Sequence, residues 1–171
     1  SKLRLLDSRS ALASLEGAVS ADPKFSLAHH ALALAWLAQG YDDRAKDEAK
    51  LAFDLSGNLS REDRLLVEGQ YREMAREWQV AIEVYGTLVG FFPDNAEYGL
   101  KLANAQSRGG KAKGALGTIA ALRLLPPPQN ADPRINLSEA QTKRALGDAK
   151  GMLAASVTAA DNAAAQGSRF V

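Results

Sequence analysis

The sequence lacks cysteine entirely and has only two histidines among its 171 residues. Without cysteine there is no disulfide framework, no thiolate zinc site and no cysteine nucleophile, although such a chain suits an oxidising or a reducing compartment equally. Long apolar runs are missing too: the most continuous one, from Leu27 to Ala38, contains both histidines and falls short of the roughly 18 residues that a membrane span needs. The first residues also lack the apolar stretch and small-residue cleavage site of a signal peptide.

An excess of charge of either sign is absent as well. The chain has 21 basic and 20 acidic residues, a formal charge of +1, with 24% of residues charged and 46% hydrophobic. This balance is typical of a soluble globular chain and differs from that of a disordered tail or a nucleic-acid-binding domain. We therefore expect neither nucleic-acid binding nor membrane insertion by this region.

What the sequence does contain is helix-forming residues. Alanine makes up about a fifth of the chain and leucine about a seventh, and no stretch alternates β-branched and polar residues over the length of a strand. Glycine and proline divide the chain into segments that suit helices of about 12 to 15 residues. These breaks fall at Pro23, Gly40, Gly57, Pro93, Gly109, Gly110, Pro126, Pro127, Pro128, Pro133, Gly147 and Gly167.

The breaks recur with a period of 34 residues. Pro93 and Pro127 are 34 positions apart, and Pro23 precedes Pro93 by twice that period plus two. The period predicts one repeat array over residues 1–171: a partial unit 1–25, units at about 26–59, 62–95, 96–129 and 133–167, and the start of another helix at 168–171. Because both ends are out of phase, we expect a piece of a longer protein, opening near the tail of one helix and continuing into a second.

Small residues recur at positions 8 and 20 of the units, where two helices must approach closely. They are Ala33 and Ala45, Gly69 and Ala81, Ala103 and Ala115, and Ala140. With larger residues near positions 11 and 24 and proline at 32, the pattern resembles the tetratricopeptide repeat. The resemblance implies an all-α fold, a right-handed α-solenoid of antiparallel helix pairs.

Local signals mark two helix starts. Ser60 precedes an acidic residue at the third position of a helix, and Asp132 precedes a proline, so both are expected to be N-caps. Gly114 and Gly117 fall inside an expected helix, where each costs about 1 kcal/mol relative to alanine. We expect close packing against a neighbouring helix to explain them.

No residue pattern predicts catalysis. His29 and His30 point about 100° apart on a helix, so they are expected to be ordinary side chains, one partly packed, rather than metal ligands. The acidic cluster at 42–48 lacks the glycine of a calcium loop and is expected to be a solvated turn. Residues 109–114 have the glycines and lysines of a phosphate loop in the wrong order and predict an inter-helix turn. We expect no enzymatic activity, no cofactor and no metal.

Aromatic residues fall mainly at packing positions of the repeat. We therefore expect them to be core residues rather than a stacking platform for ligands. They are Trp36, Tyr71, Trp78, Tyr85, Phe91 and Phe92.

The resemblance also implies where a partner would bind, because positions 2, 5, 6, 9, 12 and 13 of the first helix of each unit face the concave groove in that family. The partner-binding residues implied in this way are His30, Leu34, Gln70, Met74, Lys101, Asn104, Arg108, Arg134, Gln141 and Arg144. The groove would change from apolar to polar and basic, which suits a peptide with an apolar end and an acidic end. No lysine occupies position 5, so the clamp by which some members hold a C-terminal carboxylate is not expected.

Between Glu97 and Asp132 there are five basic residues and no acidic one. Such a stretch is either a solvated face or the end of the groove that receives an acidic partner.

The family resemblance implies a non-catalytic module for protein–protein interaction or scaffolding. Residues 59–66, Trp78 and residues 132–137 also resemble repeat regions of bacterial serine/threonine kinases and winged-helix transcriptional regulators. That second resemblance implies a sensory segment of a signalling protein, periplasmic or cytoplasmic. The alternative is a sensor for a small anion near Arg108, Arg134 and Arg144. Neither compartment nor oligomeric state follows from the sequence.

Overall fold

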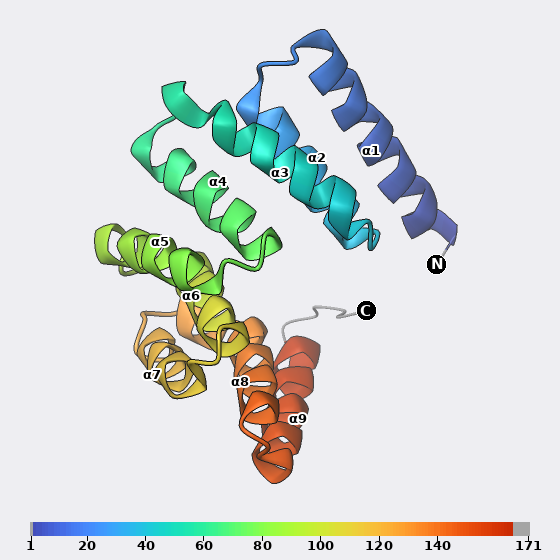
Figure 1. The fold of residues 1–171 in the computed structure, drawn as a ribbon. Helices are drawn as coiled ribbons and strands as arrows, with labels where there is room; N and C mark the ends of the chain where they lie inside the picture. The colour runs from blue at the N-terminus through green and yellow to red at the C-terminus, as the bar shows by residue number, and fades with distance from the viewer. Residues whose placement is uncertain (1, 166–171) are drawn as a thin grey trace. The chain divides into compact units, whose positions relative to one another are not determined.

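The computed structural model describes the backbone of residues 2–165 and the side chains of residues 10–164. These residues form α-helices joined by short turns and contain no β-strand, so the expected all-α class is confirmed for them (Figure 1). The expected helix start at 168–171 lies outside the described residues.

Close contacts divide the chain into two compact units, one ending at Glu77 and the other beginning at Trp78. The first contains α1 (Lys2–Ala21), α2 (Ser26–Ala38), α3 (Asp42–Asp54), the 3-10 turn η1 (Ser56–Asn58) and α4 (Arg61–Met74). The second contains α5 (Trp78–Phe91), α6 (Ala96–Arg108), α7 (Ala112–Leu122), η2 (Gln129–Ala131), α8 (Pro133–Ala145) and α9 (Ala149–Ala165). The expected repeat unit 62–95 therefore contributes one helix to each compact unit.

Antiparallel neighbours α2 and α3, α6 and α7, and α8 and α9 pack as pairs within the two units (Figure 1). The small residues at their crossings have no solvent-accessible surface, as Ala33, Ala45, Ala103 and Ala115 illustrate. A larger side chain there would force the paired helices apart. The helical-repeat spacing thus marks the positions where helices touch.

Each unit has its own apolar core. In the first, Leu32, Trp36 and Ala45 pack with Leu12, Leu15, Val19 and Met74. In the second, the core comprises Ala96, Leu100, Ala103, Ile119, Leu122 and Ile135, with Leu116 and Leu125 packed against it.

Side-chain caps begin several of the described helices, including α9, where Asp148 Oδ1 accepts a hydrogen bond from the Gly151 N–H at 2.8 Å. Ser60 Oγ accepts a hydrogen bond from the Asp63 backbone N–H at 3.1 Å and donates one to the Asp63 carboxylate at 2.7 Å. Asp132 Oδ1 accepts from the Arg134 N–H at 2.8 Å, just before the proline that opens α8. Both predicted caps are confirmed, and Asn95 caps α6 in addition.

Three local expectations are wrong. A Cβ on Gly117 would meet no atom within 4 Å, and one on Gly114 would meet only the Gln106 side chain at 3.6 Å, so close packing does not explain these glycines. The close approaches lie instead at Gly99 and Gly109. The acidic residues at 42–48 belong to α3 rather than to a turn, where Asp42 and Asp43 complement the helix dipole. Finally, the chain was expected to open near the tail of one helix and continue into a second, but residues 2–21 form one uninterrupted helix.

Candidate functional site

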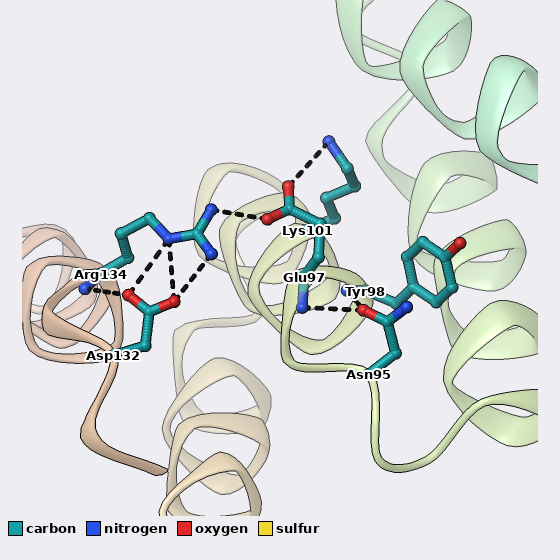
Figure 2. A network of polar contacts seen from close by, with 6 residues as sticks. All are labelled: Asn95, Glu97, Tyr98, Lys101, Asp132 and Arg134. Atoms are coloured by element: carbon teal, nitrogen blue, oxygen red, sulfur yellow. Dashed lines mark hydrogen bonds and ion pairs between the residues drawn. The ribbon is translucent and has the colours of Figure 1, made fainter. Parts of the chain in front are cut away.

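The first turns of α6 and α8 lie next to each other and are each fixed by a capping side chain. Asn95 Oδ1 accepts hydrogen bonds from the backbone N–H groups of Glu97 at 3.0 Å and Tyr98 at 3.4 Å. Asp132 does the same for α8. The caps set the direction in which Glu97 and Arg134, the second residue of each helix, leave the backbone (Figure 2).

Arg134 joins the two helices through a charged network. Its Nη1 donates to Glu97 Oε2 at 2.6 Å and its Nη2 to Asp132 Oδ2 at 2.7 Å (Figure 2). Lys101 Nζ lies 3.6 Å from the other Glu97 oxygen. Hydrogen bonds from Asp132, and then from Glu97, raise the pKa of the Arg134 guanidinium above its ordinary value, against the effect of partial burial.

The same contacts act on Asp132 in the opposite direction. Burial by itself would raise the pKa of the Asp132 carboxyl, but the hydrogen bonds from the Arg134 side chain and backbone outweigh it and hold the pKa below the ordinary value. Both groups are therefore charged near neutral pH. Arg134, which the small-anion alternative includes, is paired with the two carboxylates of Glu97 and Asp132.

Further along the α6–α8 surface the contacts are polar. Asn104 Oδ1 accepts a hydrogen bond from Ser138 Oγ at 3.0 Å, which joins the middle turns of the two helices. Arg108, in the last turn of α6, places its guanidinium 5.6 Å from the centre of the Trp78 ring. Gln141 and Arg144 on α8 are exposed. The six expected binding residues of the second unit thus lie on two helices that are in contact with each other.

The expected binding residues of the first unit differ in accessibility. Leu34 is exposed on α2, next to a half-buried His30. Gln70 is only 7% exposed, and Met74 packs against the core of the unit. Because α4 directs the side chains of Gln70 and Met74 inward, we do not include these two residues among those proposed for binding.

A pocket of about 900 Å³ opens beside the charged network, at the N-terminal ends of α6 and α8. It is lined by residues 91–97 and by Pro128, Gln129 and residues 132–134. Phe91 and Phe92 are 50% and 36% exposed at its wall, so the expectation that they are core residues is wrong. Their position at the end of α5 explains this, because the chain turns away there before the next helix begins.

Three of the five basic residues between Glu97 and Asp132 have polar partners within the second unit, and two of these partners are carboxylates. Lys101 pairs with Glu97, Lys111 donates to Gln79, and Arg123 reaches Glu139 and Asn136. Lys143 also donates to Glu139, at 2.7 Å. Burial would raise the pKa of the Glu139 carboxyl, but hydrogen bonds from Lys143 and Arg123 hold it below the ordinary value.

A buried polar contact in the first unit has no counterpart in the sequence predictions. His29 is 4% exposed; its Nδ1 lies 2.7 Å from Glu48 Oε2 and its Nε2 lies 3.0 Å from the Pro23 carbonyl oxygen. The contact fastens the turn before α2 to α3. The 19-residue separation of His29 and Glu48 gives no local signal, because it spans two helices.

The sequence analysis did not identify Asn95 or Glu97 as residues of the site, although the sequence around Asn95 contains a recognisable capping signal. Asn95, two positions after a proline and two before a glutamate, has the pattern of an N-cap. The inter-helix role of Glu97 could not be predicted, because it depends on the register of α6 against α8.

Metal sites and membrane spans are not found in the described part of the chain. No group of three or more histidine, aspartate or glutamate side chains among these residues could hold a metal ion. No helix within residues 2–165 combines the length and the apolar character required to cross a bilayer.

Comparison with known proteins identifies the fold. No protein-family model and no curated protein matches the sequence significantly. Solved structures do match: a tetratricopeptide repeat protein from Parabacteroides merdae has a TM-score of 0.70 and 13% identity, over 93% of this chain and 60% of that one. MamA has a TM-score of 0.59 and 16% identity, over 97% and 94% of the two chains. YrrB, described as a TPR protein with an unusual peptide-binding site, has a TM-score of 0.56 and 16% identity, over 93% and 79%. The chain has the tetratricopeptide-repeat fold, as its repeat spacing predicts.

Proposed function

We propose that this protein is a non-catalytic interaction module that binds a segment of a partner protein along the exposed face of α6 and α8. The observation that carries the proposal is the two-sided character of these helices. One side of each is buried in the repeat core, as Ala103 and Ala140 are, while Arg108, Gln141 and Arg144 remain exposed on the other. A stack of helix pairs needs only its buried sides for stability, which leaves the other face available for recognition.

The chemistry of this face favours a partner with an acidic end. Arg108 lies in the last turn of α6, and Lys143 and Arg144 lie in the last turn of α8. Cations at helix C-termini are compatible with the helix dipole and attract carboxylates. The peptide-binding site described for YrrB is consistent with a peptide partner for this fold.

Site-specific crosslinking tests the proposal. A photoreactive benzoylphenylalanine at position 141 should form an adduct with the partner in cells that produce the protein. The double substitution Arg108→Glu/Arg144→Glu should reduce that adduct at least tenfold, because it reverses the charge of two exposed residues of this face. Lys113→Glu, which changes the charge of an exposed residue on α7, serves as the matched control and should leave the adduct intact. An adduct that survives the double substitution would refute the assignment of this face.

We also propose, from the second sequence resemblance alone, that the module is the sensory or scaffolding part of a bacterial signalling protein. The test is the complete gene product, which should carry a kinase or winged-helix domain on the same chain. A gene product with neither domain would contradict the proposed signalling role, but it would not affect the proposal that the α6–α8 face binds a partner.

A further inference from the structure

The pocket at the N-terminal ends of α6 and α8 is acidic. Its lining includes three carboxylates, from Asp94, Glu97 and Asp132, and one guanidinium, from Arg134, which gives a net charge of −2. Two of the carboxylates are held by Arg134. Asp94 is exposed in the turn before α6 and has no ion-pair partner among the described residues, so its charge is available to a ligand.

The same pocket offers aromatic and apolar surface. Phe91 and Phe92 are among the exposed large hydrophobic residues, and Pro93, Pro128 and Pro133 also line the pocket. The edge of Phe92 meets Tyr98, with ring centres 5.8 Å apart and planes at 65°, which fixes the ring at the pocket wall (Figure 2 shows Tyr98 beside the network). Aromatic faces near carboxylates bind the apolar stem of a basic side chain and attract its charged head.

We propose that this pocket is a second docking site, distinct from the α6–α8 face, for a segment of a partner protein in which an arginine or lysine is flanked by apolar residues. The basic side chain pairs with Asp94, and its apolar neighbours lie against Phe91 and Phe92. An anionic ligand is disfavoured by the net charge of the lining and by the neutralisation of Arg134. The pocket thus selects a basic partner segment, whereas the exposed cations of α6 and α8 are proposed to select an acidic one.

A random heptapeptide library displayed on phage provides the probe. Selection on the intact protein should enrich peptides that carry arginine or lysine next to aromatic or aliphatic residues. For the most enriched peptide, Asp94→Asn should weaken binding several-fold and Asp94→Lys at least tenfold, measured by fluorescence anisotropy. Asp161→Lys makes the same charge change at an exposed position of α9 outside the pocket, and it should change the affinity by less than twofold.

Backbone amide NMR shifts locate the bound peptide. The largest shifts on titration should fall at residues 91–97 and 128–134. Far-UV circular dichroism melts of each variant show that it remains folded, which is expected because Asp94 lies in an exposed turn.

Three results would overturn the proposal: enrichment of acidic or uncharged peptides, an enriched basic peptide whose affinity is insensitive to Asp94→Lys, or shifts confined to other residues. The double substitution Arg108→Glu/Arg144→Glu should leave heptapeptide binding within twofold. The proposal for the pocket and the proposal for the α6–α8 face can therefore be confirmed or refuted independently.

Discussion

Glu139 lies between two cations, Arg123 and Lys143, and its side chain is 13% exposed. Because its pKa is lower in the folded protein than its ordinary value of 4.5, the unfolded chain binds the proton more readily. The stability contributed by Glu139 is thus fully present above pH 4.5 and is lost as the pH falls through the lower, folded-state value.

We therefore expect Glu139→Gln to lower the free energy of unfolding by about 1–2 kcal/mol at pH 6, as for other hydrogen bonds to a charged group. The difference between wild type and variant should shrink between pH 4.5 and 3, since protonation removes the same charge from the wild type. Urea denaturation of both proteins at pH 6, 4.5 and 3 measures this. A difference that is equal at the three pH values would contradict the linkage.

His29 has two acceptors as partners, the Glu48 carboxylate and the Pro23 carbonyl. Each ring nitrogen of His29 faces one of these two oxygens. A glutamine at this position has a single donating nitrogen and a different reach, so His29→Gln should lower the free energy of unfolding by about 1–3 kcal/mol. An unchanged urea midpoint for the variant would show that the contact contributes nothing to stability.

At the residue scale, the sequence predicted what depends on local geometry. The Ser60 and Asp132 caps and the buried small residues at the helix crossings follow from positions within one repeat. The His29–Glu48 contact and the exposed Phe91 and Phe92 did not follow, because they depend on how one helix meets the next. The same holds for α6 and α8: the repeat positions predicted that Arg108, Gln141 and Arg144 face outward, whereas they did not predict the acidic pocket at the start of these helices.

Two glycines on the paired helices α6 and α7 differ in their surroundings: one is closely packed and the other faces open space. A Cβ on Gly99 of α6 would collide with the side chain of Leu122 of α7, which is 4% exposed and belongs to the core. A Cβ on Gly117 of α7 would meet nothing. The same substitution should therefore have opposite effects on the two helices.

Gly99→Ala should lower the free energy of unfolding by about 1–3 kcal/mol, because Leu122 must move within a packed core. Gly117→Ala should raise it by about 0.5–1 kcal/mol, since alanine loses less conformational freedom in a helix. Thermal and urea denaturation of the two variants, each the control of the other, provide the measurement. Effects of the same sign would mean that the helices do not approach as described.

At the scale of helices, the periodicity of the sequence predicted type and position well. The units expected at 26–59, 96–129 and 133–167 begin within a residue of α2, α6 and α8. Position within a period does not specify which helix packs with which, however. The assignment of α4 and α5 to different compact units therefore could not be predicted from the repeat period.

The two compact units of the whole chain predict separable stability. Ile119 is almost completely buried in the core of the second unit, and Ile119→Ala should cost about 2–4 kcal/mol there. Stability in repeat proteins is close to a sum of local and nearest-neighbour contributions. Amide hydrogen exchange should therefore accelerate in peptides from residues 96–145 and change little in those from residues 26–54.

Val67→Ala, in the buried part of α4, is the reciprocal variant and should accelerate exchange in the first unit. If either substitution raises exchange equally across both units, the chain unfolds as one cooperative body and the prediction is wrong.

The ion pair between Glu97 and Arg134 restricts how a chain of this kind can grow. The two residues hold equivalent positions at the start of successive repeats, 37 positions apart. A tandem duplication of residues 96–132 would bring a glutamate of one copy against the same glutamate of the next, where arginine now lies, and like charges would repel. Gene duplication at this junction would therefore replace an attractive contact with a repulsive one, so the two repeats are not equivalent at this contact.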